Sequence, residues 1–100
     1  MWCRLTFVKF DLNKMDEGRR IYNEIVAPTA KKQKGNIDCF LLESVDEPGE
    51  GISYNSWKTK EDADAYETSG VYHELTSKII HTMVRQPRLK QYKVTVLPQR

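Results

Sequence analysis

The segment SWKTKEDADAYETSGVYHELTSKII, from Ser56 to Ile80, indicates the fold of this chain more clearly than any other stretch. Trp57 ends a run of residues with strand character. Thr59 and the acidic residue three positions later form a capping-box pattern, in which both side chains satisfy free N–H groups at a helix start. The pair Ser69-Gly70 weakens this helix, and a second apolar helical pattern runs on until Pro87 stops it. The segment therefore predicts a strand-to-helix junction and a helix in two parts.

Upstream of this segment the sequence predicts a strand and a long helix. Trp2–Phe10 is rich in aromatic and β-branched residues, which favour a strand. Asp11 supplies cap chemistry for a helix of about twenty residues that should end before Gly35, the expected C′ residue. Pro28 lies inside this run and is expected to kink it or to end its first part.

The remaining strands follow from alternation and turn residues. Ile37–Glu43 and Ile52–Trp57 flank a turn rich in proline, glycine and acidic residues, which predicts a hairpin. Ile37, Cys39 and Leu41 should share one face of the first of these strands, and Ser53, Asn55 and Trp57 should share one face of the second. Gln91–Leu97 also alternates and predicts the last strand.

The order of these elements is β-α-β-β-α-β, which predicts an α+β subunit of the ferredoxin-like type with a four-stranded antiparallel sheet. One hundred residues suit a single domain spanning 1–100. Both helices should cover one face of the sheet. The other face is then bare, and we expect it to present Trp57 and to pair in a two-fold homodimer.

Composition excludes several classes of function. Sixteen basic and fourteen acidic residues are mixed along the chain, so no clustered basic face predicts a nucleic-acid partner. No apolar run reaches the roughly 18 residues that cross a bilayer, so no membrane segment is expected. Cys3 and Cys39 lack metal-ligand spacing and are expected to be buried free thiols in a cytoplasmic protein without a bound metal.

Two adjacent segments resemble the antibiotic biosynthesis monooxygenase (ABM) domain, a family of the dimeric α+β barrel superfamily. They are KKQKGNIDCFLLESVDEPGEGISYNSW, residues 31–57, and KTKEDADAYETSGVYHEL, residues 58–75. The similarity extends over nearly the whole chain. It implies the same fold, a homodimer, and a pocket on the helix-facing or barrel side of each subunit that takes a small aromatic or hydrophobic molecule.

The resemblance also implies an activity. The best-described members are monooxygenases that oxidise quinols or polyphenols without a cofactor, so a dry cavity and a base or hydrogen-bond donor for the substrate anion are expected. Another branch degrades haem with an Asn on the first strand and a Trp and a His on the second helix. Those positions fall near Phe7 or Val8, at Tyr66 and at Thr76, and all are substituted here. Haem degradation by that mechanism is therefore not expected.

Asn55 and His73 are the candidate catalytic residues. Asn55 is a polar amide on a face expected to be interfacial, where either a substrate anion or a hydrogen bond across the dimer would satisfy it. His73 borders the apolar side of its helix and would act as a general base if the loop at Ser69-Gly70 opens onto the pocket. Its alternative is a boundary histidine with no ligand. His81 points away from the apolar side and is expected to be inert.

Trp57, Tyr66 and Ser53 are the candidate substrate-binding residues. Trp57 would stack on an aromatic substrate or else fill the dimer interface. Tyr66 occupies a pocket-side position in the family, with core packing as its alternative. The oxygenase branch has a polar residue and a Trp on the third strand, and its polar position falls nearer Ser53 than Asn55. Tyr22 and Tyr72 are expected to pack in the core.

Two hypotheses follow. The first is a cofactor-independent monooxygenase acting on an electron-rich aromatic or quinol, in which Asn55 and Tyr66 hold substrate oxygens, Trp57 stacks and His73 accepts a proton. The second is a non-catalytic binding or regulatory barrel that holds a small hydrophobic ligand. A sealed, wholly apolar pocket with His73 turned to solvent would favour the second hypothesis.

Overall fold

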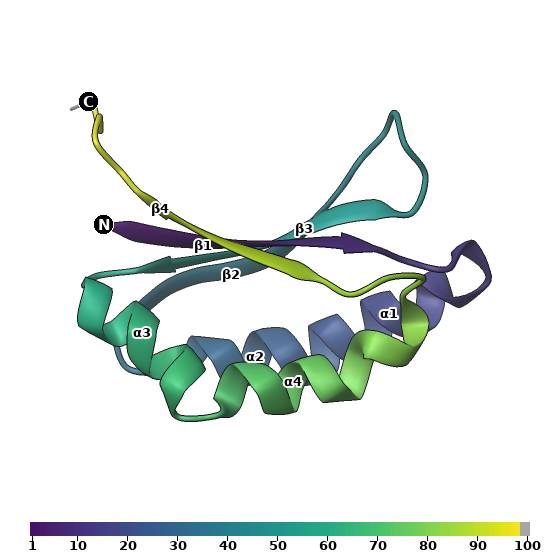
Figure 1. Cartoon of the computed structure of the whole chain (residues 1–100), viewed down its shortest axis with the longest axis horizontal. Coiled ribbons are helices and arrows are strands. Elements are labelled where there is room, and N and C mark those ends of the chain that lie inside the picture. Colours follow the sequence, from purple (N-terminus) through teal and green to yellow (C-terminus); the bar gives the residue numbers. More distant parts are fainter. Residues whose placement is uncertain (99–100) are drawn as a thin grey trace.

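The computed structural model describes residues 1–98, which form a four-stranded sheet with helices on one of its faces (Figure 1). The strands and α-helices, in chain order, are β1 (Trp2–Lys9), α1 (Met15–Ile21), α2 (Ala27–Lys31), β2 (Asn36–Glu43), β3 (Glu50–Trp57), α3 (Lys60–Thr68), α4 (Val71–Ile79) and β4 (Arg88–Lys93). Shorter helical turns are η1 (Leu12–Lys14), η2 (Tyr22–Val26) and η3 (Ile80–Thr82). The sheet order is β2-β3-β1-β4 with antiparallel pairing throughout, so the predicted ferredoxin-like α+β fold is confirmed.

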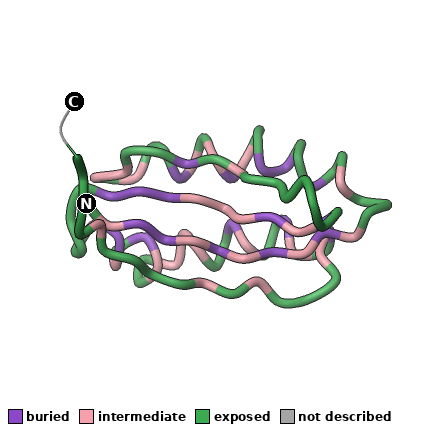
Figure 2. The backbone as a smooth tube through the Cα atoms, turned by 90° about the horizontal axis from the view of Figure 1, so that it is seen from above, coloured by how far each residue is buried: buried purple, intermediate pink, exposed green. Residues whose placement is uncertain are grey.

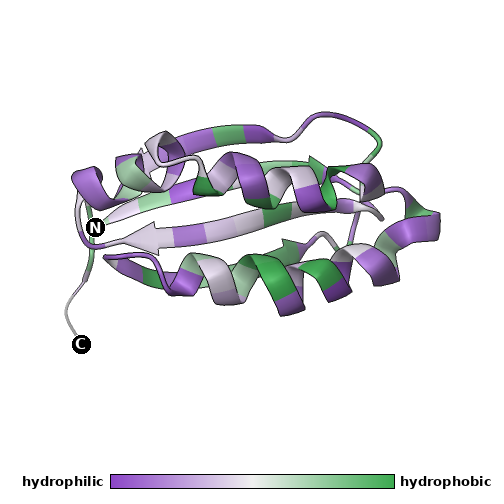
Figure 3. Ribbon diagram, turned by 90° about the horizontal axis from the view of Figure 1, so that it is seen from below, coloured by the Kyte–Doolittle hydropathy of each residue, from purple (hydrophilic) through white to green (hydrophobic). Residues whose placement is uncertain are grey.

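The pairing register determines which side chains meet the helices. Asn55 lies opposite Arg4 and Ser53 opposite Thr6, and alternate residues of each strand share a face. Buried positions concentrate along the central strands β1 and β3 (Figure 2). In Figure 3 hydrophobic and hydrophilic residues alternate along the helices, as expected of helices with one apolar side.

Trp57 lies on the helix-covered face, which corrects the prediction that it belongs to the bare one. Its side chain is 0 % exposed and packs in the core, with its ring centroid 5.0 Å from that of Tyr66. Alternation correctly grouped Trp57 with Asn55 and Ser53. It does not say which of the two faces the helices cover.

The first helical region is interrupted rather than continuous. Between α1 and α2 the backbone widens into the π-helical turn η2, just before Pro28. Proline has no N–H to donate to the preceding turn, so a change of hydrogen-bond pattern at this point is expected. The helix ends at Lys31, so Gly35 lies beyond the C′ position predicted for it. Gly35 is needed for another reason: its φ is +80°, and a Cβ would collide with Asp62.

The second helical region begins as predicted and ends earlier. The Thr59 hydroxyl accepts a hydrogen bond from the Asp62 backbone N–H (3.1 Å). Gly70, with φ +91°, separates α3 from α4. The helix ends at Ile79 and not at Pro87, because the fully buried Thr82 hydroxyl donates to the Ile79 carbonyl (2.6 Å) within a 3₁₀ turn.

Two strand details also differ from the sequence prediction. β4 occupies Arg88–Lys93 and not Gln91–Leu97, because it pairs with β1 and β1 begins at Trp2. After Lys93 the Val94 N–H donates to the Met1 carbonyl, which extends the pairing with β1 by one hydrogen bond. On β2 a bulge between Asn36 and Asp38 leaves Ile37 43 % exposed, so it does not share the buried face with Cys39.

Candidate functional site

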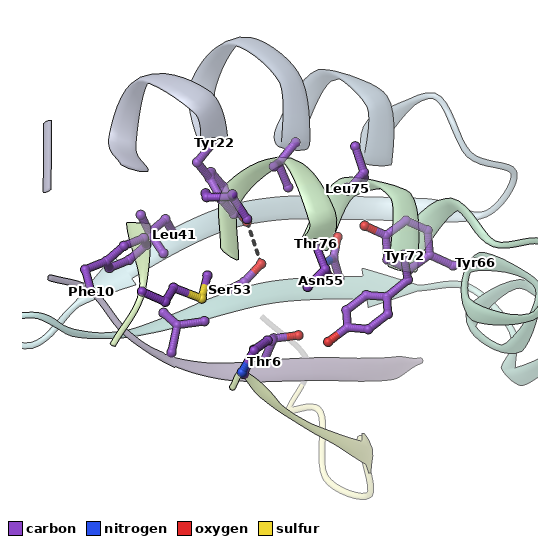
Figure 4. A pocket seen from close by; sticks show the side chains of 15 residues that line it. Thr6, Phe10, Tyr22, Leu41, Ser53, Asn55, Tyr66, Tyr72, Leu75 and Thr76 are labelled. Atoms are coloured by element: carbon purple, nitrogen blue, oxygen red, sulfur yellow. Dashed lines mark hydrogen bonds between the residues drawn. The ribbon is translucent and has the colours of Figure 1, made fainter. Parts of the chain in front are cut away.

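A cavity lies between the helix-covered face of the sheet and the helices (Figure 4). Its volume is about 40 Å³. One buried water needs roughly 10–15 Å³ measured in this way, so the cavity has room for about three. Its wall consists of Thr6, Val8, Phe10, Tyr22, Val26, Leu41, Ser53, Asn55, Tyr66, Tyr72, Leu75, Thr76, Ile79, Met83 and Pro87.

The middle of the cavity holds a hydrogen-bonded pair of hydroxyl groups. The Tyr22 hydroxyl lies 2.8 Å from the Ser53 hydroxyl, drawn as the dashed line in Figure 4. It also lies 3.3 Å from Sγ of Cys39, a buried free thiol as predicted. Burial raises the pKa of Tyr22 and that of Cys39. Both groups therefore stay protonated at neutral pH, and Tyr22 can donate a hydrogen bond but cannot act as a base.

Asn55 presents its amide to the cavity from β3. The residue is 4 % exposed, and its Oδ1 accepts a hydrogen bond from Nδ2 of Asn36 (3.4 Å). The bulge on β2 turns Asn36 toward this position, where its Nδ2 also lies 3.3 Å from the Ser56 carbonyl. Residues 1–98 provide no partner for the Asn55 Nδ2, which leaves that group free to donate to a ligand.

An aromatic series closes the same end of the cavity. Tyr66 is 4 % exposed and lies between Trp57 and Tyr72, with a ring-centroid separation of 6.0 Å to the latter. Burial raises the pKa of Tyr66, so its hydroxyl remains a hydrogen-bond donor. Figure 4 shows Tyr66 and Tyr72 beside Asn55 and Thr76. This end therefore offers several neutral donors within a small volume.

Charged groups are missing from the cavity wall. Among its described residues the only ionisable side chains are the three tyrosines. Within residues 1–98 no three His, Cys, Asp or Glu side chains are placed to hold a metal ion. The wall can thus donate hydrogen bonds to an oxygen atom, but it supplies neither a base nor a counter-ion.

The profile of the family described as antibiotic biosynthesis monooxygenase matches residues 1–77. This chain belongs to the ABM family. Among proteins of curated function none matches the sequence closely enough to count as a relative.

Solved structures agree with this ABM fold. A candidate antibiotic biosynthesis monooxygenase from Nitrosomonas europaea superposes with a TM-score of 0.80 at 18 % identity, over 96 % of this chain and all of that one. A counterpart from Deinococcus radiodurans gives 0.84 at 11 % identity, over 99 % and 97 % of the two chains. The protein Rv0793 from Mycobacterium tuberculosis gives 0.80 at 12 %, over 98 % of each chain. At such identities these similarities establish the fold of this ABM protein and nothing further.

The structure brings some of the candidate site residues together and leaves others apart. Ser53, Asn55 and Tyr66 all line the cavity of this ABM protein. Trp57 does not line it; it lies behind Tyr66, and its buried Nε1 has no acceptor among the described residues. His73 is exposed on the outside of α4, with its ring 5.7 Å from that of Tyr72, and does not reach the cavity.

His81 is exposed, as expected, and its Nε2 lies 3.0 Å from Oε1 of Glu17. This contact joins η3 to α1 on the surface. The hydrogen bond from His81 lowers the pKa of Glu17. Neither His81 nor Glu17 belongs to the described cavity wall.

The structure also shows where two residues lie at positions that the haem-degrading branch of the ABM family uses. Tyr66 and Thr76 both line the cavity. Neither offers a nitrogen ligand for iron, and the cavity of about 40 Å³ is far smaller than a porphyrin. The residues present therefore do not fit a haem group.

Sequence reasoning missed several residues of the wall. The predicted core packing of Tyr22 and Tyr72 is confirmed, and both residues in addition border the cavity, which the sequence did not indicate. Thr6 and Thr76 were not singled out as contacts. The signal was present for Thr76, which follows Tyr72 by one helical turn and so shares its side of α4. It was present for Thr6 in the strict alternation of β1.

No helix formed by the described residues is both long enough and apolar enough to span a bilayer.

Proposed function

We propose that this ABM protein oxidises a weakly acidic, electron-rich aromatic compound, such as a quinol or an anthrone, with molecular oxygen and without a cofactor. One observation supports this above all: uncharged hydrogen-bond donors gather at one end of a cavity that is otherwise apolar and contains no charged side chain. Such a site stabilises a phenolate or enolate oxygen and keeps water from its oxidised intermediates.

The chemistry needs little from the protein. The anion of an anthrone transfers electrons to oxygen, one oxygen atom becomes the new carbonyl of the ring, and the other leaves as water with the two hydrogens of the oxidised carbon. The donors at Asn55, Tyr66 and Thr76 hold the substrate oxygen. Ser53 and Tyr22 bond to each other beside it and can contact a second oxygen of the ring.

The proton must leave without help from the cavity wall. His73 lies outside, and the buried tyrosines have raised pKa values. The substrate therefore releases its proton to solvent before or as it binds. Substrates that ionise readily should react fastest.

The cavity must also widen to admit a ring. An apolar cavity of about 150 Å³ holds benzene, whereas this one measures about 40 Å³. Tyr72, Met83 and Pro87 are partly exposed members of the wall. Tyr72 and Met83 have side chains that can rotate, and Met adapts its shape most readily.

A non-catalytic binding protein is the second candidate function. The exposed position of His73 favours it, because the chain then lacks its candidate base. The hydroxyl and amide donors in the cavity favour the oxygenase, because a site that only stores a hydrocarbon has no use for them.

We also propose that the chain works as a homodimer, joined through the bare face of the sheet. Phe40 stacks on Tyr54 there with ring centroids 4.6 Å apart, and Phe40 and Leu42 are 42 % and 46 % exposed. Analytical ultracentrifugation should show a dimer that Leu42→Arg converts to a monomer. Val45→Arg is the matched control, since Val45 is 96 % exposed in the β2–β3 turn. A wild-type monomer would refute this proposal.

Oxygen uptake tests the activity. Purified protein, treated with a chelator and free of flavin, is mixed with anthrones, naphthohydroquinones and simple quinols. We expect turnover that falls about 10²-fold or more in Asn55→Ala and Tyr66→Phe, because each removes a donor to the developing charge. His73→Ala should leave the rate unchanged. Absence of uptake with every compound, while the same compounds bind, would leave the binding function in its place.

A further inference from the structure

The cavity is divided along the strand direction into a polar end and an apolar end. Ser53 lies opposite Thr6 on β1, and Asn55 follows Ser53 on the same face of β3, so the polar wall residues of both strands share one stretch of the sheet. Arg4, opposite Asn55, lies outside the wall and directs its guanidinium to Asp64 and Glu67. Further along β1 the wall continues with Val8 and then Phe10. From Thr6 to Phe10 the strand advances roughly 13 Å, at about 3.3 Å per residue.

The helix above the sheet shows the same division. Along α4 and the residues after it, the wall is formed first by Tyr72 and Thr76 and then by Ile79 and Met83. Leu75 is the apolar exception at the polar end. Figure 4 shows this arrangement directly, with Asn55, Thr76, Tyr66 and Tyr72 on one side, Phe10 and Leu41 on the other, and Tyr22 with Ser53 between them.

We propose that the ligand is amphipathic: an uncharged oxygenated ring carrying an alkyl or prenyl substituent. The ring oxygen lies at the Asn55–Tyr66 end, and the hydrocarbon substituent runs along Phe10 and Ile79 toward Met83. The proposal depends on the proposed function only in assigning the cavity as the ligand site. It adds the substrate class. Without an apolar end of the cavity, aromatic compounds with and without a hydrocarbon substituent would bind equally well.

Two features of the wall support this orientation. A carboxylate or an ammonium group is charged before it enters, and burying it beside a wall without a counter-ion is very costly, so both are disfavoured at either end. A phenol can enter uncharged and lose its proton as it binds, where the donors of Asn55 and Tyr66 face its oxygen. Met83 and Pro87 are partly exposed, which gives the end of a substituent a route to the surface. At the Asn55 end the wall is mostly polar, so a hydrocarbon substituent gains more by lying against Phe10, Ile79 and Met83.

Binding of redox-inert 4-alkylphenols, measured by calorimetry, tests the proposal without any turnover. From 4-methylphenol to 4-pentylphenol the affinity should rise about fourfold for each methylene group that leaves water. Alkylbenzenes of equal length, which lack the hydroxyl, should bind at least tenfold more weakly. The matched 4-alkylbenzoates should not bind.

Two variants separate the ends of the cavity. Tyr66→Phe should weaken all the alkylphenols by the same factor and leave the alkylbenzenes unchanged. Met83→Gln, which keeps the length of the side chain and makes it polar, should remove the gain from the longer substituents and leave 4-methylphenol unaffected. In carbon-labelled methionine spectra, only the longer compounds should shift the Met83 methyl signal.

Affinity that does not depend on chain length would overturn the amphipathic ligand, and so would a Met83→Gln defect equal for short and long phenols. Different results would contradict the proposed oxidation and the proposed ligand class. If the alkylphenols follow the expected series and no quinol consumes oxygen, the ligand class stands and the activity does not. If quinols are oxidised at rates independent of their substituents, the activity stands and the ligand class does not.

Discussion

The cavity wall lacks a base, and this determines how the rate should depend on pH. Among the described wall residues only tyrosines ionise, and burial raises the pKa of Tyr22 and Tyr66 further above its ordinary value of 10.0. Below the pKa of the substrate the reactive anion becomes tenfold scarcer with each pH unit. We therefore expect log kcat/KM to rise with a slope of one and to level off at the pKa of the substrate itself. A histidine base would instead give a midpoint near 6.5 for every substrate.

The assay is oxygen uptake across pH 5–9 with a series of substituted naphthohydroquinones or anthrones whose solution pKa values span about two units. The midpoint should move with the substrate pKa, unit for unit, in the wild type and in His73→Ala alike. A midpoint that stays at one pH for every compound would refute the reasoning, because it would reveal a titrating group of the protein. If His73→Ala abolished such a midpoint, His73 would be the base after all.

Three further outcomes are expected. Asn36→Ala should lower kcat about tenfold when Asn55 is present and should have no further effect in the Asn55→Ala background, because Asn36 acts by orienting the Asn55 amide. If steady-state kinetics showed that the two substitutions lower kcat additively, this coupling would be contradicted. The contribution of Tyr22 and Tyr66 to the free energy of unfolding should be fully present below pH 10 and should fall above it by up to about 1.4 kcal/mol per pH unit for each tyrosine. The reason is that both tyrosines stay protonated in the folded chain while they ionise in the unfolded chain. Urea titrations from pH 8 to 11 measure this free energy, and Tyr22→Phe should make its decrease with pH less steep. Trp57→Ala should cost about 3–5 kcal/mol and lower Tm by more than about 12 °C in calorimetry, because the side chain is fully buried; a change under about 4 °C would contradict the assigned packing.

Elements that depend on neighbouring residues were predictable from the sequence. The start of α3 follows from the hydroxyl of Thr59, and the break before α4 follows from Gly70, whose positive φ other residues rarely adopt. The hairpin of β2 and β3 follows from alternation on both sides of a turn. Each signal lies within a few residues of its effect, and each was correct.

Features that depend on distant residues were not predictable. The end of β4 is determined by the start of β1, with which it pairs. The end of α4 is determined by the burial of Thr82 in the core. The face on which Trp57 lies depends on where the helices pack, which alternation alone cannot supply. For the same reason Tyr22 and Tyr72 looked like ordinary core residues, although both border a cavity.

The chemistry of the cavity wall argues that it holds a ligand. Asn55 and Tyr66 are each 4 % exposed, and the described residues give neither the Asn55 Nδ2 nor the Tyr66 hydroxyl a partner. Neither atom is among the fully enclosed groups that lack a partner, so water in the cavity can bond to both until a ligand replaces it. Packing alone would be served better by Phe at position 66 and by an apolar residue at position 55. The chain instead keeps both donors at one end of a hydrocarbon-lined cavity, and an oxygen atom of a bound aromatic ring would satisfy them together.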